Sequence, residues 1–315
     1  MSYDRSKPLT RKNLIEFLKS LDIEVKTNTK ARGNNGLYQK NRIDVSRGLK
    51  EEKAIEVLVH EFAHHIHYKI DKDFVKTGGS LETLFNTTDI ETIKSELINV
   101  TNLMDKNSRL KIFVDAKEEA SKTIKSMQSA IKRDYPEFQR SKKFSEFEKY
   151  IKGSEAKYLV KYDAIRIMQG FFFKKERILT VKNLEIDFPD MPKAFQIYIK
   201  LCSMQRKQSK LSRRINKLNK YYEKPTELFA RFVQGYFTNP ETVSTVAPIT
   251  TKRFNELMEK GHYKEMKDLF EIFANRWKLP RIIFFDLPTI IHNNSGTPHS
   301  TCFFTALVTI LAWSI

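Results

Sequence analysis

Apolar residues recur along most of this chain at the three- and four-residue spacing of an amphipathic helix. The clearest case is 50–70, whose buried face would consist of Ile55, Leu58, Val59, Phe62, Ala63 and Ile66. Further helices are predicted over 10–21, 88–102, 109–133, 141–150, 154–169, 192–219, 226–237, 252–260 and 263–277. The pattern therefore predicts a predominantly helical domain.

Short strand patterns gather ahead of the 50–70 helix. Candidate strands lie at 23–27, 37–38 and 42–45, and Gly33-Asn34-Asn35-Gly36 is typical of a turn because Gly and Asn tolerate positive φ. Another strand is predicted over 178–188. The expected fold class is thus α+β, with a small N-terminal β-sheet beside a long helix.

The 50–70 helix contains a possible metal-binding pair. His60 and His64 are four residues apart, which places both imidazoles on one face of a helix. Two imidazole nitrogens on one face can bind one Zn²⁺ ion, and Glu61 would then project beside the metal, where it can act as a general base. The spacing predicts His60 and His64 as ligands and Glu61 as the catalytic residue.

The alternative is a chance match on an amphipathic helix. Against it, Phe62 and Ala63 between the histidines are uncharged, and the preceding residues 57–59 are apolar. Histidines entering such a core need a partner, because burial of an unpaired polar group is costly. We therefore favour a true metal site.

A third ligand has to come from elsewhere in the chain. Glu227 is the best candidate, because it stands in the first turn of an otherwise apolar helix and needs a positive partner if it is buried. Arg231 at i+4 is a competing partner, and a carboxylate at a helix N-terminus also complements the helix dipole. The rival ligands are Glu91, Glu96, Glu118 and Glu119.

Other polar side chains have less specific roles. His67 lies too far along the helix from His60 to share its ion and is assigned a supporting or surface role, while His65 points away and is assigned a structural one. Candidates for stabilising an oxyanion are Tyr221, Tyr222, Tyr236, Arg231 and His262.

The charge of the chain bears on its possible partners. The net charge of +18 is consistent with a polyanion partner, but acidic residues are interleaved through most of the chain, which favours a solvated lysine-rich surface. The exception is 200–224, a basic amphipathic helix with a single acid. Its candidate nucleic-acid-binding residues are Arg206, Lys207, Arg213 and Arg214.

The two ends of the chain differ in composition from its body. Residues 1–10 contain no apolar run typical of a secretory signal, and two cysteines cannot form a disulfide framework, so a cytoplasmic location is expected. Residues 281–315 form an apolar tail, which could be a buried segment, a membrane-associated segment or foreign sequence from a frameshift. Its final run is shorter than a bilayer span, so no firm membrane partner is predicted.

The stretch Val59-His60-Glu61-Phe62-Ala63-His64-His65 resembles the active-site helix of gluzincin-type metallopeptidases. Residues 224–232 are similar to a Pro-x-Glu-x-Phe-Ala-Arg segment in zincin-like domains of large polyvalent proteins from phages and mobile elements. The resemblance implies zinc ligands at His60, His64 and Glu227, and Glu61 as the base. It also implies a zincin-like domain over 1–280 that carries a helical insertion at about 105–220.

The expected function is a zinc-dependent metallopeptidase of a phage or mobile element, with a peptide or protein substrate. The alternative is a nucleic-acid-associated mobile-element protein whose zinc site is structural or vestigial. A peptidase that acts on a DNA-bound regulator, as ImmA/IrrE-type peptidases do, would combine the two.

Overall fold

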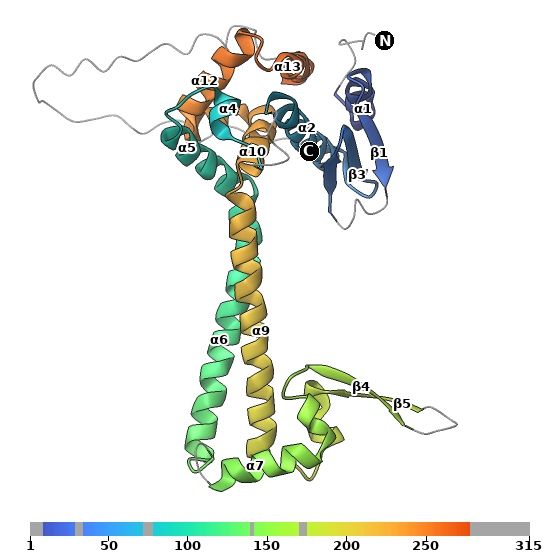
Figure 1. Cartoon of the computed structure of the whole chain (residues 1–315), viewed down its shortest axis with the longest axis vertical. Helices are drawn as coiled ribbons and strands as arrows, with labels where there is room; N and C mark the ends of the chain where they lie inside the picture. The colour runs from blue at the N-terminus through green and yellow to red at the C-terminus, as the bar shows by residue number, and fades with distance from the viewer. Residues whose placement is uncertain (1–8, 29–33, 72–77, 139–141, 170–174, 278–315) are drawn as a thin grey trace, which may run out of the picture. The chain divides into compact units, whose positions relative to one another are not determined.

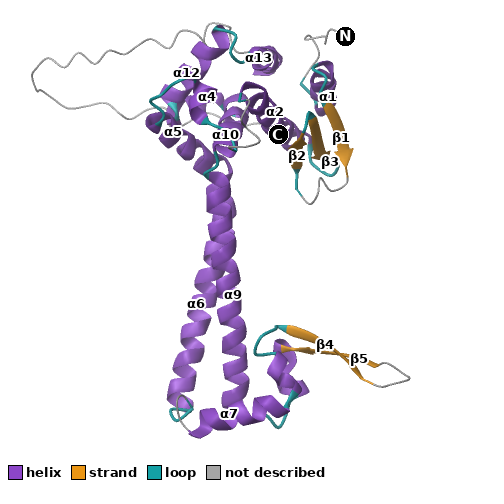
Figure 2. Cartoon of the chain, in the orientation of Figure 1, coloured by secondary structure: helices purple, strands orange, loops and turns teal. Residues whose placement is uncertain are grey.

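The fold is α+β and predominantly helical, with two small sheets in the part of the chain that the structure describes (Figures 1 and 2). It was obtained as a computed structural model that describes residues 9–28, 34–71, 78–138, 142–169 and 175–277. The predicted apolar tail 281–315 lies outside these described residues. The expected fold class is confirmed at this level.

The first elements that the structure describes are a helix and a three-stranded sheet. Helix α1 (Arg11–Ser20) is followed by β1 (Glu24–Asn28), β2 (Gly36–Gln39) and β3 (Arg42–Ser46). The strand order is β1-β3-β2, with β1 parallel and β2 antiparallel to β3, so β2 lies at an edge of the described sheet.

Helix α2 (Glu51–Ile70) packs against this sheet and against α1. Its first turn holds Glu51 and Glu52, whose negative charges complement the positive end of the helix dipole. The apolar face predicted for this segment is buried, as are His60 and Glu61. The helix ends at Ile70, one residue before Asp71 takes up extended backbone geometry.

Short helices complete the first hydrophobic core together with α2 and the sheet. Among them, α10 has the most extensive packing with α2. Helix α10 begins with a proline, which is tolerated there because the first-turn amides of a helix have no intrahelical partner. The helices are α4 (Leu81–Phe85), α5 (Glu91–Thr101), α10 (Pro225–Thr238), α11 (Pro240–Val246), α12 (Pro248–Glu259) and α13 (Lys264–Trp277).

Between α5 and α10 the chain forms a long helical hairpin. A π-helical turn (Asn102–Lys106) leads directly into α6 (Asn107–Asp134), and α9 (Lys193–Tyr222) leads back to α10. The two helices run side by side (Figure 2). They are antiparallel, because Ser121 hydrogen-bonds Gln208 while Tyr222 hydrogen-bonds Asp105.

A second hydrophobic core forms where α6 and α9 meet the segment between them. Its centre is aromatic, with the buried Phe138 surrounded by Phe147, Phe195 and Tyr198. The elements of that segment are α7 (Lys142–Gly153), a 3₁₀ turn (Glu155–Tyr158), β4 (Ala164–Gln169), β5 (Lys175–Thr180), a second 3₁₀ turn (Val181–Asn183) and α8 (Leu184–Asp187).

The helix predicted over 154–169 is wrong. The helical turn ends at Tyr158, and 164–169 forms strand β4, which pairs antiparallel with β5 from Ala164↔Thr180 to Gln169↔Lys175. In β4, the half-buried Ile165 and Ile167 alternate with the exposed Arg166 and Met168, which is the period of a strand. The strand predicted over 178–188 is correct only to Thr180, after which the chain is helical.

Candidate metal centre

Helix α2 presents two histidines on one face toward α10. The rings of His60 and His64 lie 4.9 Å apart, centroid to centroid, with planes at 89°. His60 is buried, and His64 is partly exposed. One helical turn between the two residues therefore produces a pair of imidazoles with converging Nε2 atoms.

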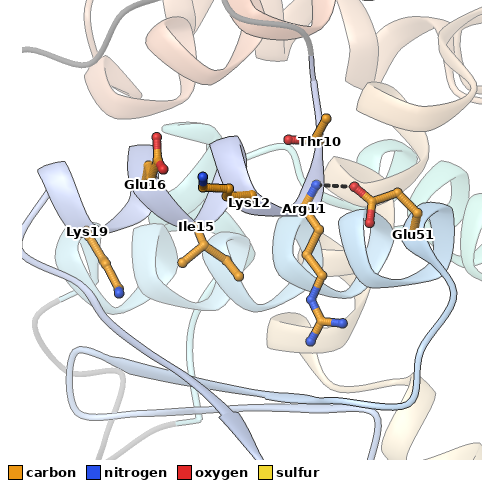
Figure 3. A pocket seen from close by; sticks show the side chains of 7 residues that line it. All are labelled: Thr10, Arg11, Lys12, Ile15, Glu16, Lys19 and Glu51. Atoms are coloured by element: carbon orange, nitrogen blue, oxygen red, sulfur yellow. Dashed lines mark hydrogen bonds between the residues drawn. The ribbon is translucent and has the colours of Figure 1, made fainter.

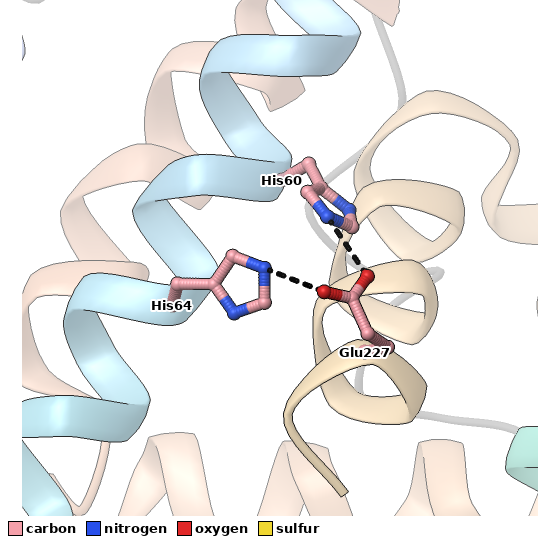
Figure 4. A group of neighbouring side chains, drawn as sticks. All are labelled: His60, His64 and Glu227. Atoms are coloured by element: carbon pink, nitrogen blue, oxygen red, sulfur yellow. Dashed lines mark ion pairs between the residues drawn. The ribbon is translucent and has the colours of Figure 1, made fainter. Parts of the chain in front are cut away.

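Helix α10 brings a carboxylate to this pair (Figure 4). Glu227 Oε2 lies 3.5 Å from His60 Nε2, and Glu227 Oε1 lies 3.5 Å from His64 Nε2. One ligand atom from each of the three residues lies within 4.8 Å of the others. We call His60, His64 and Glu227 the metal group, because together they could hold a metal ion.

The separations within the metal group suit coordination better than hydrogen bonding. A good hydrogen bond to oxygen has a heavy-atom distance of about 2.9 Å, whereas two ligands of a tetrahedral Zn²⁺ ion at about 2.1 Å lie roughly 3.4 Å apart. Glu227 Oε2 and His60 Nδ1 are buried and make no hydrogen bond with any residue that the structure describes. A bound cation would satisfy this buried carboxylate oxygen, which has no hydrogen-bond partner of its own.

The protonation states favour metal binding. Burial lowers the pKa of His60 and lowers the pKa of His64 to about 4, so both imidazoles are neutral near pH 7. Burial opposes ionisation of Glu227, but the two imidazoles and the Tyr221 hydroxyl together lower its pKa to about 2. Neutral imidazoles and an ionised carboxylate are the forms that bind a cation.

The other carboxylates considered as a third ligand lie elsewhere. Glu91, Glu118 and Glu119 are exposed. Glu96 is buried, but its Oε2 accepts hydrogen bonds from the amide and hydroxyl of Thr250, at 2.7 Å each. Glu96 thereby accepts hydrogen bonds from backbone amides in the first turn of α12.

Arg231 does not compete for Glu227. Its Nη2 lies 3.1 Å from Asp105 Oδ2, and its Nη1 donates a hydrogen bond to Gln234. Asp105 belongs to the π-helical turn and also accepts a hydrogen bond of 2.6 Å from the Tyr222 hydroxyl. The guanidinium is therefore anchored to Asp105, which leaves the carboxylate of Glu227 to the two histidines.

Glu61 lies beside the metal group without belonging to it. Its carboxylate accepts a hydrogen bond from the backbone amide of Tyr38 in β2, and only 7% of the residue is exposed. Burial, together with the negative charge of Glu227, raises the pKa of Glu61 to about 8. This carboxyl group therefore holds a proton readily, as a general base must, and a nearby cation would lower its pKa.

Strand β2 approaches Glu61 closely because residue 36 is glycine. A Cβ atom at Gly36 would lie 2.4 Å from Val57 Cγ1 and 2.6 Å from Glu61 Oε1, so no larger side chain fits. The amide of Ser46 donates to the carbonyl of Asn35, which means that residue 35 faces β3. By the alternation of an antiparallel pair, the backbone groups of Gly36 and Tyr38 face away from β3.

The neighbouring histidines of α2 have other surroundings. His65 Nδ1 lies 3.2 Å from the Tyr38 hydroxyl, and its ring stacks on Phe62. His67 is fully buried, packs edge-on against Phe229 of α10 and has Asp71 Oδ2 3.8 Å from its Nε2. The alternative of a surface role for His67 is therefore wrong.

The tyrosine and histidine candidates for an oxyanion role differ in their hydrogen-bond partners. Tyr221 hydrogen-bonds Glu227, whereas the hydroxyl of Tyr222 is bound to Asp105. Tyr236 donates to Asn255, and His262 Nε2 lies 3.2 Å from the carbonyl oxygen of Leu84, so neither is aimed at the metal group. The sequence does not rank the adjacent Tyr221 and Tyr222, because helical spacing alone does not say which of the two reaches Glu227.

Further residues around the site gave little signal in the sequence. Asp105 is one of many acids on or near the predicted helices. Tyr38 contacts Glu61 through its backbone amide, so its side chain gave no signal. The sequence predicts Gly36 as a turn residue, whereas the structure has it as the first residue of β2. Its close approach to Glu61 depends on the packing of β2 on α2.

The basic candidates on α9 lie outside the metal group. Arg206 Nη2 donates to the carbonyl of Leu159 and to Asp163, at 3.2 and 2.7 Å. Lys207, Arg213 and Arg214 are exposed.

A surface pocket on α1 contains none of the metal-group residues (Figure 3). Charged side chains of both signs dominate its lining, and the amide of Arg11 donates to Glu51 there. The lining residues are Thr10, Arg11, Lys12, Ile15, Glu16, Lys19 and Glu51.

Comparison with protein families, curated proteins and solved structures found no match for this chain. Among the described residues, no helix is both long enough and apolar enough to cross a bilayer.

Proposed function

We propose that this protein is a zinc-dependent metallopeptidase with a zincin-like fold. The observation that carries the proposal is the buried group of His60, His64 and Glu227 with the carboxylate of Glu61 beside it. Two histidines and one glutamate form the ligand set of a hydrolytic zinc site, and a second glutamate beside them is positioned to act as its base.

The number of ligands favours a catalytic ion over a structural one. Structural zinc sites are closed by four protein ligands, whereas catalytic sites keep one position for water or substrate. Within the described residues, the group contains three ligands. This supports a peptidase over the alternative in which the zinc is structural.

The residues of this chain have separate tasks in the proposed reaction. Bound zinc would supply Lewis-acid chemistry, polarising a carbonyl group and acidifying a water molecule. Glu61 takes the proton from the attacking water and returns it to the leaving amine. Tyr221, which hydrogen-bonds Glu227, and Arg231, whose charge acts on His60 and Glu61, are groups that could steady negative charge on the substrate.

The position of Glu61 at the edge of β2 suggests how a peptide would bind. The backbone groups of Gly36 and Tyr38 face away from β3, and Glu61 is bonded to one of these amides. An extended peptide could pair with the remaining groups of this edge and place its scissile bond next to Glu61.

The test measures metal content and peptide cleavage in the same preparations. Glu61→Gln should keep one zinc ion per chain but lose about 10²–10⁴-fold in the rate of cleaving a mixture of unstructured peptides, followed by mass spectrometry. His60→Ala should lose the zinc itself. Glu52→Gln, at an exposed position of the same helix, is the control and should retain both. Unchanged cleavage by Glu61→Gln would contradict the mechanism.

A further inference from the structure

The α6–α9 hairpin is an antiparallel coiled coil with a regular heptad pattern. Counting from Leu201 as position a, the a and d positions of α9 continue without interruption at 204, 208, 211, 215, 218 and 222, and these residues are buried or half-buried. In α6 the same spacing runs through 110, 113, 117, 120, 124, 127 and 131. The hydrogen bond between Ser121 and Gln208 fixes the register of the two helices.

Outside its core positions, α9 has a segregated distribution of charge. Between 205 and 220, positions b and e hold only Ser, Asn and Gln. Positions c, f and g, which adjoin one another around the helix, are all Lys or Arg between 206 and 220: Arg206, Lys207, Lys210, Arg213, Arg214, Lys217 and Lys220. A helix that merely needed solubility would mix both signs of charge on this face.

Two of these seven cations have intramolecular partners. Arg206 and Lys210 both contact Asp163, at 2.7 and 3.4 Å. The other five are exposed, and none forms an ion pair with a carboxylate in the described part of the chain. We call Lys207, Arg213, Arg214, Lys217 and Lys220 the basic stripe.

The partner helix does not neutralise the basic stripe. Position g of one helix flanks position g of the other in an antiparallel coiled coil, and these positions commonly pair opposite charges. The register places Thr123 beside Lys207 and Ala116 beside Arg214. Neither residue of α6 can pair with a cation, so the packing of the hairpin does not explain the stripe.

The charge of the whole chain is concentrated in the same region. Residues 107–222 contain 28 Lys and Arg against 13 Asp and Glu, a net charge of +15 out of the total of +18. The remaining residues, which include the metal group, are close to neutral. A polyanion would therefore be drawn to the hairpin and not to the rest of the chain.

We propose that the basic stripe of α9 binds the phosphate backbone of a duplex nucleic acid without reading its sequence. The stripe extends over the 14 residues from Lys207 to Lys220, or about 20 Å. A duplex of this length carries on the order of ten phosphates. Its two arginines can bind phosphate oxygens bidentately. The flanking b and e positions are polar, so the face lacks the large apolar side chains with which an amphipathic helix enters a lipid surface.

The experiment compares two variants of the full chain that lose the same number of charges. In the stripe variant, all five residues are changed to Gln (Lys207→Gln, Arg213→Gln, Arg214→Gln, Lys217→Gln and Lys220→Gln). The control variant carries Lys111→Gln, Lys122→Gln, Lys125→Gln, Lys132→Gln and Lys152→Gln, all at exposed positions of α6 and α7. Glutamine is a good helix former, so both variants should keep their helices, which circular dichroism checks.

Binding is measured by fluorescence anisotropy with a 30-base-pair DNA duplex and an RNA duplex of arbitrary sequence, between 50 and 200 mM salt. The stripe variant should bind at least about 100-fold more weakly than wild type and show a shallower salt dependence, while the control should lose much less. Tighter binding of one duplex would identify the natural nucleic acid.

Equal loss in the two variants would overturn the proposal, because it would mean that net charge and not this face decides binding. Absence of duplex binding by the wild-type chain, or selective binding to anionic vesicles or to an acidic polypeptide, would overturn it as well. Zinc content should be the same in all three proteins, so the result is independent of the proposed peptidase activity.

Discussion

Tyr221 is the side chain that connects α9 to the metal group. Its hydroxyl hydrogen-bonds Glu227, and the buried surroundings and the charge of that carboxylate raise the pKa of Tyr221. The hydrogen bond helps to keep Glu227 ionised and fixes the direction of its carboxylate. Such supporting hydrogen bonds to a metal ligand influence affinity nearly as much as the ligand does.

Changing Tyr221 to Phe should therefore weaken zinc binding without abolishing it. We expect the zinc dissociation constant of Tyr221→Phe to rise about 10- to 100-fold, as measured by competition with a chromophoric chelator. Tyr158→Phe removes a hydroxyl from an exposed tyrosine and should leave the constant unchanged. Equal zinc affinities for Tyr221→Phe and wild type would mean that the hydroxyl does not orient Glu227.

At the scale of elements, the π-helical turn at Asn102–Lys106 joins the first core to the coiled coil. Its Asp105 binds Arg231 of α10 and Tyr222 of α9, so three elements meet at one carboxylate. The side chain of Arg231 is only 12% exposed. Without its anion, this guanidinium would be available to Glu227, which stands one turn earlier on α10.

Asp105→Asn should consequently lower both stability and zinc affinity. Loss of one member of a buried ion pair costs about 3–5 kcal/mol, and the partial exposure of Asp105 reduces this to about 2 kcal/mol in the free energy of unfolding. Urea denaturation measures the stability, and chelator competition measures the affinity. Asp115→Asn, at an exposed position of α6, is the control. A stability loss with unchanged zinc affinity would show that Arg231 does not compete for Glu227.

At the scale of the whole molecule, the described residues form two hydrophobic cores. The first core surrounds the metal group, and the second joins the ends of α6 and α9 to the segment between them. Phe232 and Phe138 are fully buried, one in each core. The two positions therefore allow the cores to be perturbed separately.

Replacing either phenylalanine by alanine should destabilise its own core by about 3–5 kcal/mol. Phe232→Ala should also reduce zinc binding, because Phe232 lies on the helix that presents Glu227. Phe138→Ala should leave zinc binding intact and increase amide hydrogen exchange in α7 and β5. Loss of zinc from Phe138→Ala would instead show that the two cores unfold as one cooperative unit.

Much of the fold was accessible from the sequence because it depends on local periodicity. The 3.6-residue repeat predicted the helices over 50–70, 109–133 and 192–219, each confirmed to within three residues. The same repeat failed at 154–169, where the strand of 164–169 depends on its pairing with β5, a partner that no local pattern identifies.

The candidate site, too, was determined partly by local sequence and partly by tertiary structure. The spacing of His60, Glu61 and His64 on a single helix was determined by the sequence alone, since an α-helix fixes the directions of residues four apart. The approach of Glu227, 163 residues after His64, was decided by the tertiary structure: the antiparallel coiled coil returns the chain to its starting point, and α10 packs on α2. Tertiary packing also selected Tyr221 over Tyr222 and assigned Arg231 to Asp105, because contacts between distant elements follow from the path of the chain and not from its local repeat.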